Sequence, residues 1–292
     1  MSRRLRRRPT RERQGGSPFR KFRRQPTAVI GAVMLVLITV PLYLASWLAP
    51  QDPYAVDVPN RLAKFSWSHP LGTDGLGRDM LSRMLYGGRK SVLLTLAVTL
   101  LITVVGVSLG VLAGMRGGLT DRFVGFLIDI VLALPLVIVS MVTIAVLGGG
   151  TAKLVFVIAV LGWPRHARLA RAATLSMRER EFIDACRVLG ASRLRIAFRH
   201  IVPNIIWPVV VLSTIDVGRI LLLVSTLSFL GFGARPPAPE WGSMLADSRR
   251  YFFVAPRLLI IPGVAIFLVA LGANLFGEGL RDAFASKTKL IK

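Results

Sequence analysis

The sequence predicts an all-α integral membrane protein with six membrane-spanning helices and both termini in the cytoplasm. Three observations lead to this fold class: a mean hydropathy of +0.59, a hydrophobic fraction of 53% over 292 residues, and long apolar runs separated by basic segments. Soluble domains rarely reach such a hydropathy, so the bilayer is the expected solvent. The net charge of +23 would also suit nucleic acid, but the apolar content favours lipid.

The predicted spans are six apolar segments, at residues 27–49, 91–114, 123–147, 154–163, 205–229 and 258–280. Five of them reach the roughly 20 residues that a bilayer core requires. The fourth is short, because Pro164, Arg165, His166 and Arg168 follow its apolar run. It spans only if those cations lie at the lipid boundary or face the bundle. Without it, the chain has five spans and its termini lie on opposite sides.

The chain divides into three parts around these spans. Residues 1–26 form a basic cytoplasmic tail that we expect to be disordered and to face lipid, with nucleic-acid binding as the minor alternative. Residues 27–90 hold the first span and an outer segment. We interpret this span as uncleaved, because its apolar run exceeds the roughly 7–15 residues of a signal peptide. Residues 91–292 form a core of five spans with a cytoplasmic loop at about 174–204.

The distribution of basic residues predicts the orientation. With the amino terminus inside, 26 of the 38 Lys and Arg residues fall in the tail, the 115–122 turn, the 165–204 loop and the carboxyl end. Only 11 fall in the outer segments 50–90, 148–153 and 231–257. Because cytoplasmic loops carry an excess of Lys and Arg, both termini are expected inside.

The stretch 184–204 is basic and has the pattern of two short helices. Gly190 separates them and suits a helix C-cap, and Pro203 is expected to end the second helix. Apolar residues repeat at i, i+3, i+4 and i+7 on both sides of Gly190, which predicts one apolar face for each helix. These faces consist of Phe182, Ala185, Cys186 and Leu189, and of Leu194, Ala197, Phe198 and Ile201. A helix on anionic lipid, a solvated connector and a docking element for a cytoplasmic partner all fit this pattern.

The same stretch resembles the loop of binding-protein-dependent ABC importer permeases, in which an acidic–Ala–Ala triplet precedes Gly and a later apolar–x–Pro. Here the triplet is Asp184-Ala185-Cys186, followed by Gly190 and by Pro203. Asp184 replaces the usual Glu, and Cys186 replaces the second Ala. The resemblance implies a coupling helix that rests on an ATP-hydrolysing subunit. The residues that it assigns to this loop are Asp184, Ala185, Cys186, Gly190, Arg193, Arg195, Arg199 and Pro203.

Three further segments resemble the dipeptide, oligopeptide and nickel subfamily, and in particular its second, C-type permease. They are residues 69–91, 227–256 and 274–287. Before Leu227 this chain has Val224-Ser225-Thr226, where an acidic residue is frequent in the subfamily. The resemblance implies a type I permease fold in the bacterial inner membrane, a homologous permease as heterodimer partner, two ABC ATPase subunits and an extracytoplasmic substrate-binding protein.

No catalytic motif is found in this chain. "GGRKS" at residues 87–91 lacks the spacing of a phosphate-binding loop, and no GxSxG or HExxH is found. The three histidines lack metal-ligand spacing, and Cys186 is the only cysteine. We therefore expect no enzyme activity and no cofactor in this chain, with ATP and Mg²⁺ bound by partner subunits.

Three charged residues lie inside apolar runs and are candidates for the translocation path: Asp129, Asp216 and Arg219. Asp216 and Arg219 have i, i+3 spacing, which predicts a pair on one helix face. Either the pair stabilises the bundle or it lines the path, where a zwitterionic peptide would meet both signs. For Asp129 we favour packing or a gate.

Glycines 106, 110 and 114 repeat every fourth residue and predict close packing of the second span. The overall prediction is a permease subunit of an ABC importer for dipeptides or oligopeptides, with nickel or another small solute as the alternative within the family. A self-contained ion-coupled transporter, with the three charges as relays, is the alternative from another class.

Overall fold

The structure is a computed structural model that describes residues 25–288, and its ordered elements are helical. Most of the tail predicted at 1–26 lies outside the described residues, and Pro26 already begins the first described helix. The helices are α2 (Pro26–Tyr43), α3 (Ala45–Leu48), η1 (Val58–Asn60), α4 (Met80–Arg116), α5 (Gly118–Ala133), α6 (Leu136–Leu147), α7 (Thr151–Gly162), α8 (Pro164–Arg178), α9 (Glu181–Val188), α10 (Arg193–Ile196), η2 (Ala197–Ile201), α11 (Val202–Phe229), α12 (Trp241–Ser248), η3 (Arg249–Tyr251) and α13 (Arg257–Thr288).

Four helices in the described part are long and apolar enough to cross a bilayer. They are α2, α4, the continuous helix Arg193–Phe229 and α13. A fifth crossing results if α5 and α6, which meet at 90°, are counted as one broken span. The prediction of six separate spans is therefore not confirmed. The third predicted span bends where Pro135 precedes α6, and the fourth is limited by Pro164 to the 12 residues of α7.

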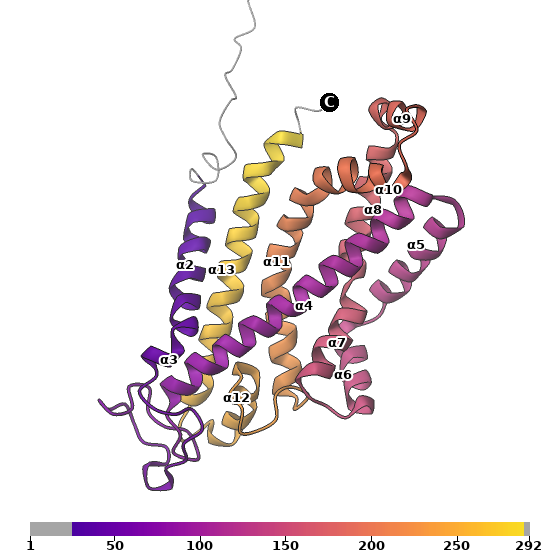
Figure 1. Ribbon diagram of the computed structural model, residues 1–292. Coiled ribbons are helices and arrows are strands. Elements are labelled where there is room, and N and C mark those ends of the chain that lie inside the picture. The colour runs from indigo at the N-terminus through magenta and orange to yellow at the C-terminus, as the bar shows by residue number, and fades with distance from the viewer. Residues whose placement is uncertain (1–24, 289–292) are drawn as a thin grey trace, which may run out of the picture.

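Helix α4 begins well before the predicted second span, so the boundary placed at residue 91 falls inside this helix. Asp79 caps it, because its side chain accepts a hydrogen bond from the Ser82 amide at 2.8 Å. The helix has 37 residues and a length of about 55 Å. It runs diagonally across the bundle (Figure 1), consistent with its being longer than the roughly 30 Å of a bilayer core.

The glycines at 106, 110 and 114 bring α4 against α8, as the sequence predicts. A Cβ on Gly106 would lie 2.6 Å from the Trp163 carbonyl oxygen, and a Cβ on Gly110 would lie 2.4 Å from that of Ala167. On the other side of the bundle, α13 packs against both α2 and α11 (Figure 1). The largest buried side chain near the α3 end is Trp241, whose Nε1 donates to the Met84 carbonyl oxygen.

The start of α2, the end of α13 and the α9 helix all lie at one end of the molecule (Figure 1). This arrangement agrees with the prediction that the two ends of the helical core lie on the same side as the 174–204 loop. That this side is the cytoplasm stays a prediction from the basic residues.

Candidate functional site

The 178–203 loop contains a well-defined helix end at Gly190. The Gly190 amide donates to the Arg187 carbonyl at 3.0 Å, and the Ala191 amide donates to the Cys186 carbonyl at 3.0 Å. This pair of bonds, with φ of +77° at Gly190, is a Schellman C-cap. The predicted C-cap is confirmed, and it requires glycine because other residues are strained at such a φ.

The prediction that Pro203 ends the second loop helix is wrong. Helix α10 continues through the π-helical turn η2 into α11 without a break. The Val202 amide donates to the Ala197 carbonyl oxygen, five residues earlier. Pro203 directly follows this turn, where the pairing changes from π-helical to α-helical, and the helix continues past it. The second half of the loop is therefore the end of a long helix.

The apolar faces predicted for the loop differ from the buried ones. Ile183, Ile196 and Ile201 are fully buried and pack into one core with residues of α4, α8 and α11. Of the predicted positions, only Ile201 is fully buried. Cys186 and Ala197 are partly buried against the same core, so each predicted face is correct only in part.

Four large apolar side chains of the loop are instead turned to solvent: Val188, Leu189, Leu194 and Phe198. We call these the exposed loop side chains. Their exposed fractions lie between 68% and 88%. Exposed apolar side chains on a basic segment suit contact with lipid or with another macromolecule.

The acidic triplet of the loop is at the surface. Asp184 accepts a hydrogen bond from Arg187 Nη1 at 2.7 Å, and both side chains are exposed. Ala185 is exposed, whereas Cys186 is partly buried with its Sγ 3.8 Å from Nε2 of His200. The two residues that differ from the usual triplet thus have different surroundings: Asp184 is at the surface, and Cys186 lies beside the His200 imidazole.

A basic cavity of about 570 Å³ lies between the end of α4 and the loop. Of the predicted loop residues, Gly190 and Arg193 line it, together with Arg187. Arg195 and Arg199 are exposed and do not contribute to its lining. Arg178, the last residue of α8, and Arg116 also line the cavity. Arg116 was not predicted, because it comes from the end of α4, which only the folded chain brings to the loop.

The charges inside apolar runs fall into two separate groups. The predicted pair is confirmed: Arg219 Nε donates to Asp216 Oδ1 at 2.9 Å. A second arginine, Arg165 of α8, donates from Nη1 to the same oxygen at 2.8 Å. Asp129 has its own partner, Arg168 of α8, at 2.6 Å, and both side chains are mostly exposed.

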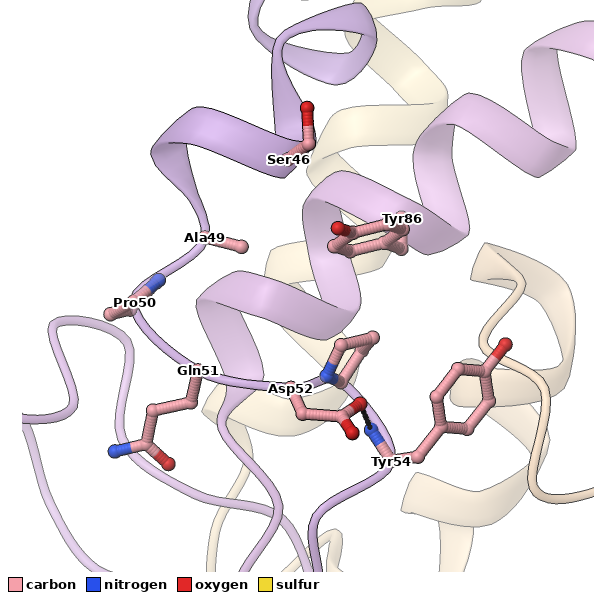
Figure 2. A pocket seen from close by; sticks show the side chains of 8 residues that line it. Ser46, Ala49, Pro50, Gln51, Asp52, Tyr54 and Tyr86 are labelled. Atoms are coloured by element: carbon pink, nitrogen blue, oxygen red, sulfur yellow. Dashed lines mark hydrogen bonds between the residues drawn. The ribbon is translucent and has the colours of Figure 1, made fainter.

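An open cleft of about 610 Å³ lies at the other end of the molecule, between the turn after α3 and α4 (Figure 2). Asp52 is its one charged lining residue, and this carboxylate accepts a hydrogen bond from the Tyr54 amide at 2.8 Å. The Tyr54 and Tyr86 rings border the cleft. The cleft therefore has no cluster of converging charges, unlike the cavity beside the loop.

Comparison with known proteins identifies the fold and the family. The chain is similar in structure to a chain of the MetNI methionine ABC transporter in an inward-facing conformation. The match covers 69% of this chain and 97% of that chain, with a TM-score of 0.53 and 18% sequence identity. The fold is therefore that of a type I ABC permease.

Two curated relatives are named glutathione transport system permease protein GsiD. The protein from Shigella flexneri serotype 5b (strain 8401) is 40% identical over 272 residues, which cover 93% of this chain and 90% of the relative. The protein from Escherichia coli O6:K15:H31 is 39% identical over the same coverage.

Two family descriptions match different parts of the chain. Residues 16–64 match the N-terminal TM domain of oligopeptide transport permease C. Residues 106–290 match the binding-protein-dependent transport system inner membrane component. The chain belongs to this second family, as an inner-membrane permease subunit of an ABC importer.

Proposed function

We propose that this permease serves the uptake of dipeptides or oligopeptides and forms half of a translocation path with a homologous permease. The similarity to permeases named for glutathione, itself a peptide, supports a peptide substrate over nickel or another small solute. Membership of an ABC importer family favours this function over a self-contained ion-coupled transporter. An extracytoplasmic binding protein would deliver the substrate to the side opposite the 178–203 loop.

The exposed loop side chains are the observation that carries the coupling part of this proposal. Two ATPase subunits, which bind ATP and Mg²⁺, would each receive one permease loop. The apolar side chains of α9 and α10 would enter a groove on the ATPase, and neighbouring arginines would meet acidic residues there. Because η2 joins α10 to α11 without a break, a displacement of the loop would pass directly into a membrane-spanning helix.

The experiment is uptake into proteoliposomes that contain this chain, its partner permease, the ATPases and the binding protein. We expect ATP-dependent accumulation of labelled peptides and no accumulation of nickel. Gly190→Val places a β-branched residue at φ +77°, at a cost of about 1–2 kcal/mol. Because no atom lies within 4 Å of a Cβ at Gly190, this strain acts on the loop conformation alone. We expect ATP hydrolysis without matching uptake.

Gly149→Val is the matched control. Gly149 also has a positive φ, of +58°, and a Cβ there would likewise meet nothing within 4 Å. It lies in the turn between α6 and α7, away from the loop. Normal coupling in Gly190→Val, or equal uncoupling in Gly149→Val, would contradict the coupling role. Uptake without any ATP requirement would contradict the proposed function itself.

A further inference from the structure

The Asp216 carboxylate lies near the middle of a membrane-spanning helix and holds two arginines from different helices. Asp216 is the fifteenth of the 28 residues of α11, and its side chain is completely buried. Oδ1 accepts from Arg165 Nη1 at 2.8 Å and from Arg219 Nε at 2.9 Å, and Oδ2 accepts from Arg219 Nη2 at 3.2 Å. Arg165 is the second residue of α8 and lies 51 residues before Asp216 in the chain.

The charges of this cluster do not cancel. A guanidinium stays protonated in proteins, so two arginines against one carboxylate leave one positive charge. His166 is the other titratable group here, with Nδ1 3.7 Å from Asp216 Oδ2, and its protonation would only add to this charge. A net charge in a membrane-spanning segment is costly and marks a candidate functional site.

The cluster is closed at the back and open at the front. Behind the carboxylate, His166 is fully buried, its Nε2 lies 3.2 Å from the Ser213 hydroxyl, and that hydroxyl lies 2.9 Å from Thr103 Oγ1. The side chains of Arg165 and Arg219 are 41% and 34% exposed. The bonds to Asp216 use one nitrogen of Arg165 and two of Arg219, so each of these partly exposed guanidiniums keeps N–H donors that do not bond to Asp216.

We propose that Arg165 and Arg219 form a binding site for a carboxylate of the transported substrate, halfway along the translocation path. This inference rests on the proposed function and assigns the substrate class as a peptide with a free carboxyl group. Guanidinium groups match carboxylates through paired N–H donors. Asp216 holds both arginines in place, and its negative charge weakens the site. Weak binding suits transport, because a substrate must leave the path as well as enter it.

The test compares a peptide that has a free C-terminal carboxylate with the same peptide amidated at that end, in proteoliposomes containing the complete transporter. The measured quantity is the ratio of the two initial uptake rates. The binding protein also chooses between the peptides, but it is identical in all samples, so its preference cancels when a variant is compared with wild type. Arg165→Gln removes the charge and the fork of donors, and Arg165→Lys keeps the charge alone.

We expect Arg165→Gln to lower the acid-to-amide ratio by about tenfold, because a lost hydrogen bond to a charged group is worth at least that factor. Arg165→Lys should give an intermediate ratio. Arg122→Gln, which removes an exposed arginine of α5, should leave the ratio unchanged. If Arg165 only stabilises the bundle, its loss will slow both peptides equally and leave the ratio at the wild-type value.

Two results would count against different parts of the proposal. An unchanged ratio in Arg165→Gln, with ATP-dependent peptide uptake intact in wild type, refutes the site and leaves the proposed function standing. Absence of uptake of either peptide by the wild-type transporter refutes the proposed function instead. Should Arg165→Gln fail to assemble, the ratio in Arg165→Lys decides: a wild-type value contradicts the site, and a reduced value supports it.

Discussion

Gly110 allows α4 to lie directly against α8, and replacing it with alanine tests that packing. The new Cβ would lie 2.4 Å from the Ala167 carbonyl oxygen, 2.9 Å from the Ala170 Cβ and 2.9 Å from the Arg171 amide nitrogen. Two of these three atoms belong to the backbone and cannot rotate away. The α8 backbone therefore has to move, and α4 and α8 form the most extensive helix contact in the described chain.

The magnitude follows from two opposing terms. Alanine is favoured over glycine inside a helix by about 0.5–1 kcal/mol. Overpacking a tight contact costs about 1–3 kcal/mol. We expect a net loss of about 1 kcal/mol for Gly110→Ala, the difference between the middle values of these two ranges. Gly263→Ala in α13 is the control, since the nearest atom to its new Cβ is a leucine methyl at 4.0 Å. Only the favourable helix term applies there.

The assay is thermal unfolding of the detergent-solubilised protein, followed by tryptophan fluorescence. The melting temperature should fall by about 2–4 °C for each kcal/mol lost in Gly110→Ala, and should stay level or rise slightly in Gly263→Ala. A Gly110→Ala protein as stable as Gly263→Ala would refute the close approach of α4 and α8, and with it the placement of Arg165 beside Asp216.

Three further predictions concern single contacts. Asp216→Asn should destabilise the protein by about 2–3 kcal/mol, which is less than for a fully buried ion pair because both arginines are partly exposed. Asp129→Asn, at an exposed ion pair, should cost under about 1 kcal/mol. Equal melting temperatures of the two variants would contradict this difference. Glu240→Ala should lower the free energy of unfolding by about 1–2 kcal/mol, because this buried side chain caps α12 by accepting hydrogen bonds from the Gly242 and Ser243 amides. Glu240→Gln should lower it by less, measured in the same thermal unfolding assay. Phe198→Ala should leave the melting temperature within error because the side chain is exposed, yet lower the amount of ATPase that co-purifies; undiminished co-purification would argue against its contact with that subunit.

Much of the candidate site follows from local sequence patterns. The Gly190 C-cap is set by the few residues around it, so the sequence predicts it correctly. The Asp216–Arg219 pair is also local, because residues three apart share a helix face. The buried face of the loop was predicted only in part. Cys186, Ala197 and Ile201 pack against the core, but Ile183 and Ile196, which share that core with Val111 and Ala170, were missed because apolar residues also occur at neighbouring positions.

The sequence also did not determine whether a helix bends or continues at Pro203 and Pro135. Pro203 has a residue before it that disfavours helix, yet the π-turn η2 absorbs the mismatch and the helix continues. Pro135, by contrast, stands at a 90° bend. The backbone is extended at Leu134 and Pro135, with ψ of 138° and 97°, whereas Ile201 and Val202 before Pro203 keep helical angles.

The sequence by itself determined the membrane class, the approximate positions of the four long spans and the close-packing face of Gly106, Gly110 and Gly114. Hydropathy and residue size act over short stretches of chain, which is why these features are local. Only the tertiary structure decided that Arg165 joins Arg219 at Asp216 and that Arg116 lies beside the loop at Gly190. Such contacts join residues far apart in sequence. They exist only after α8 has packed into the glycine face of α4, since that packing fixes where each charge on α8 lies.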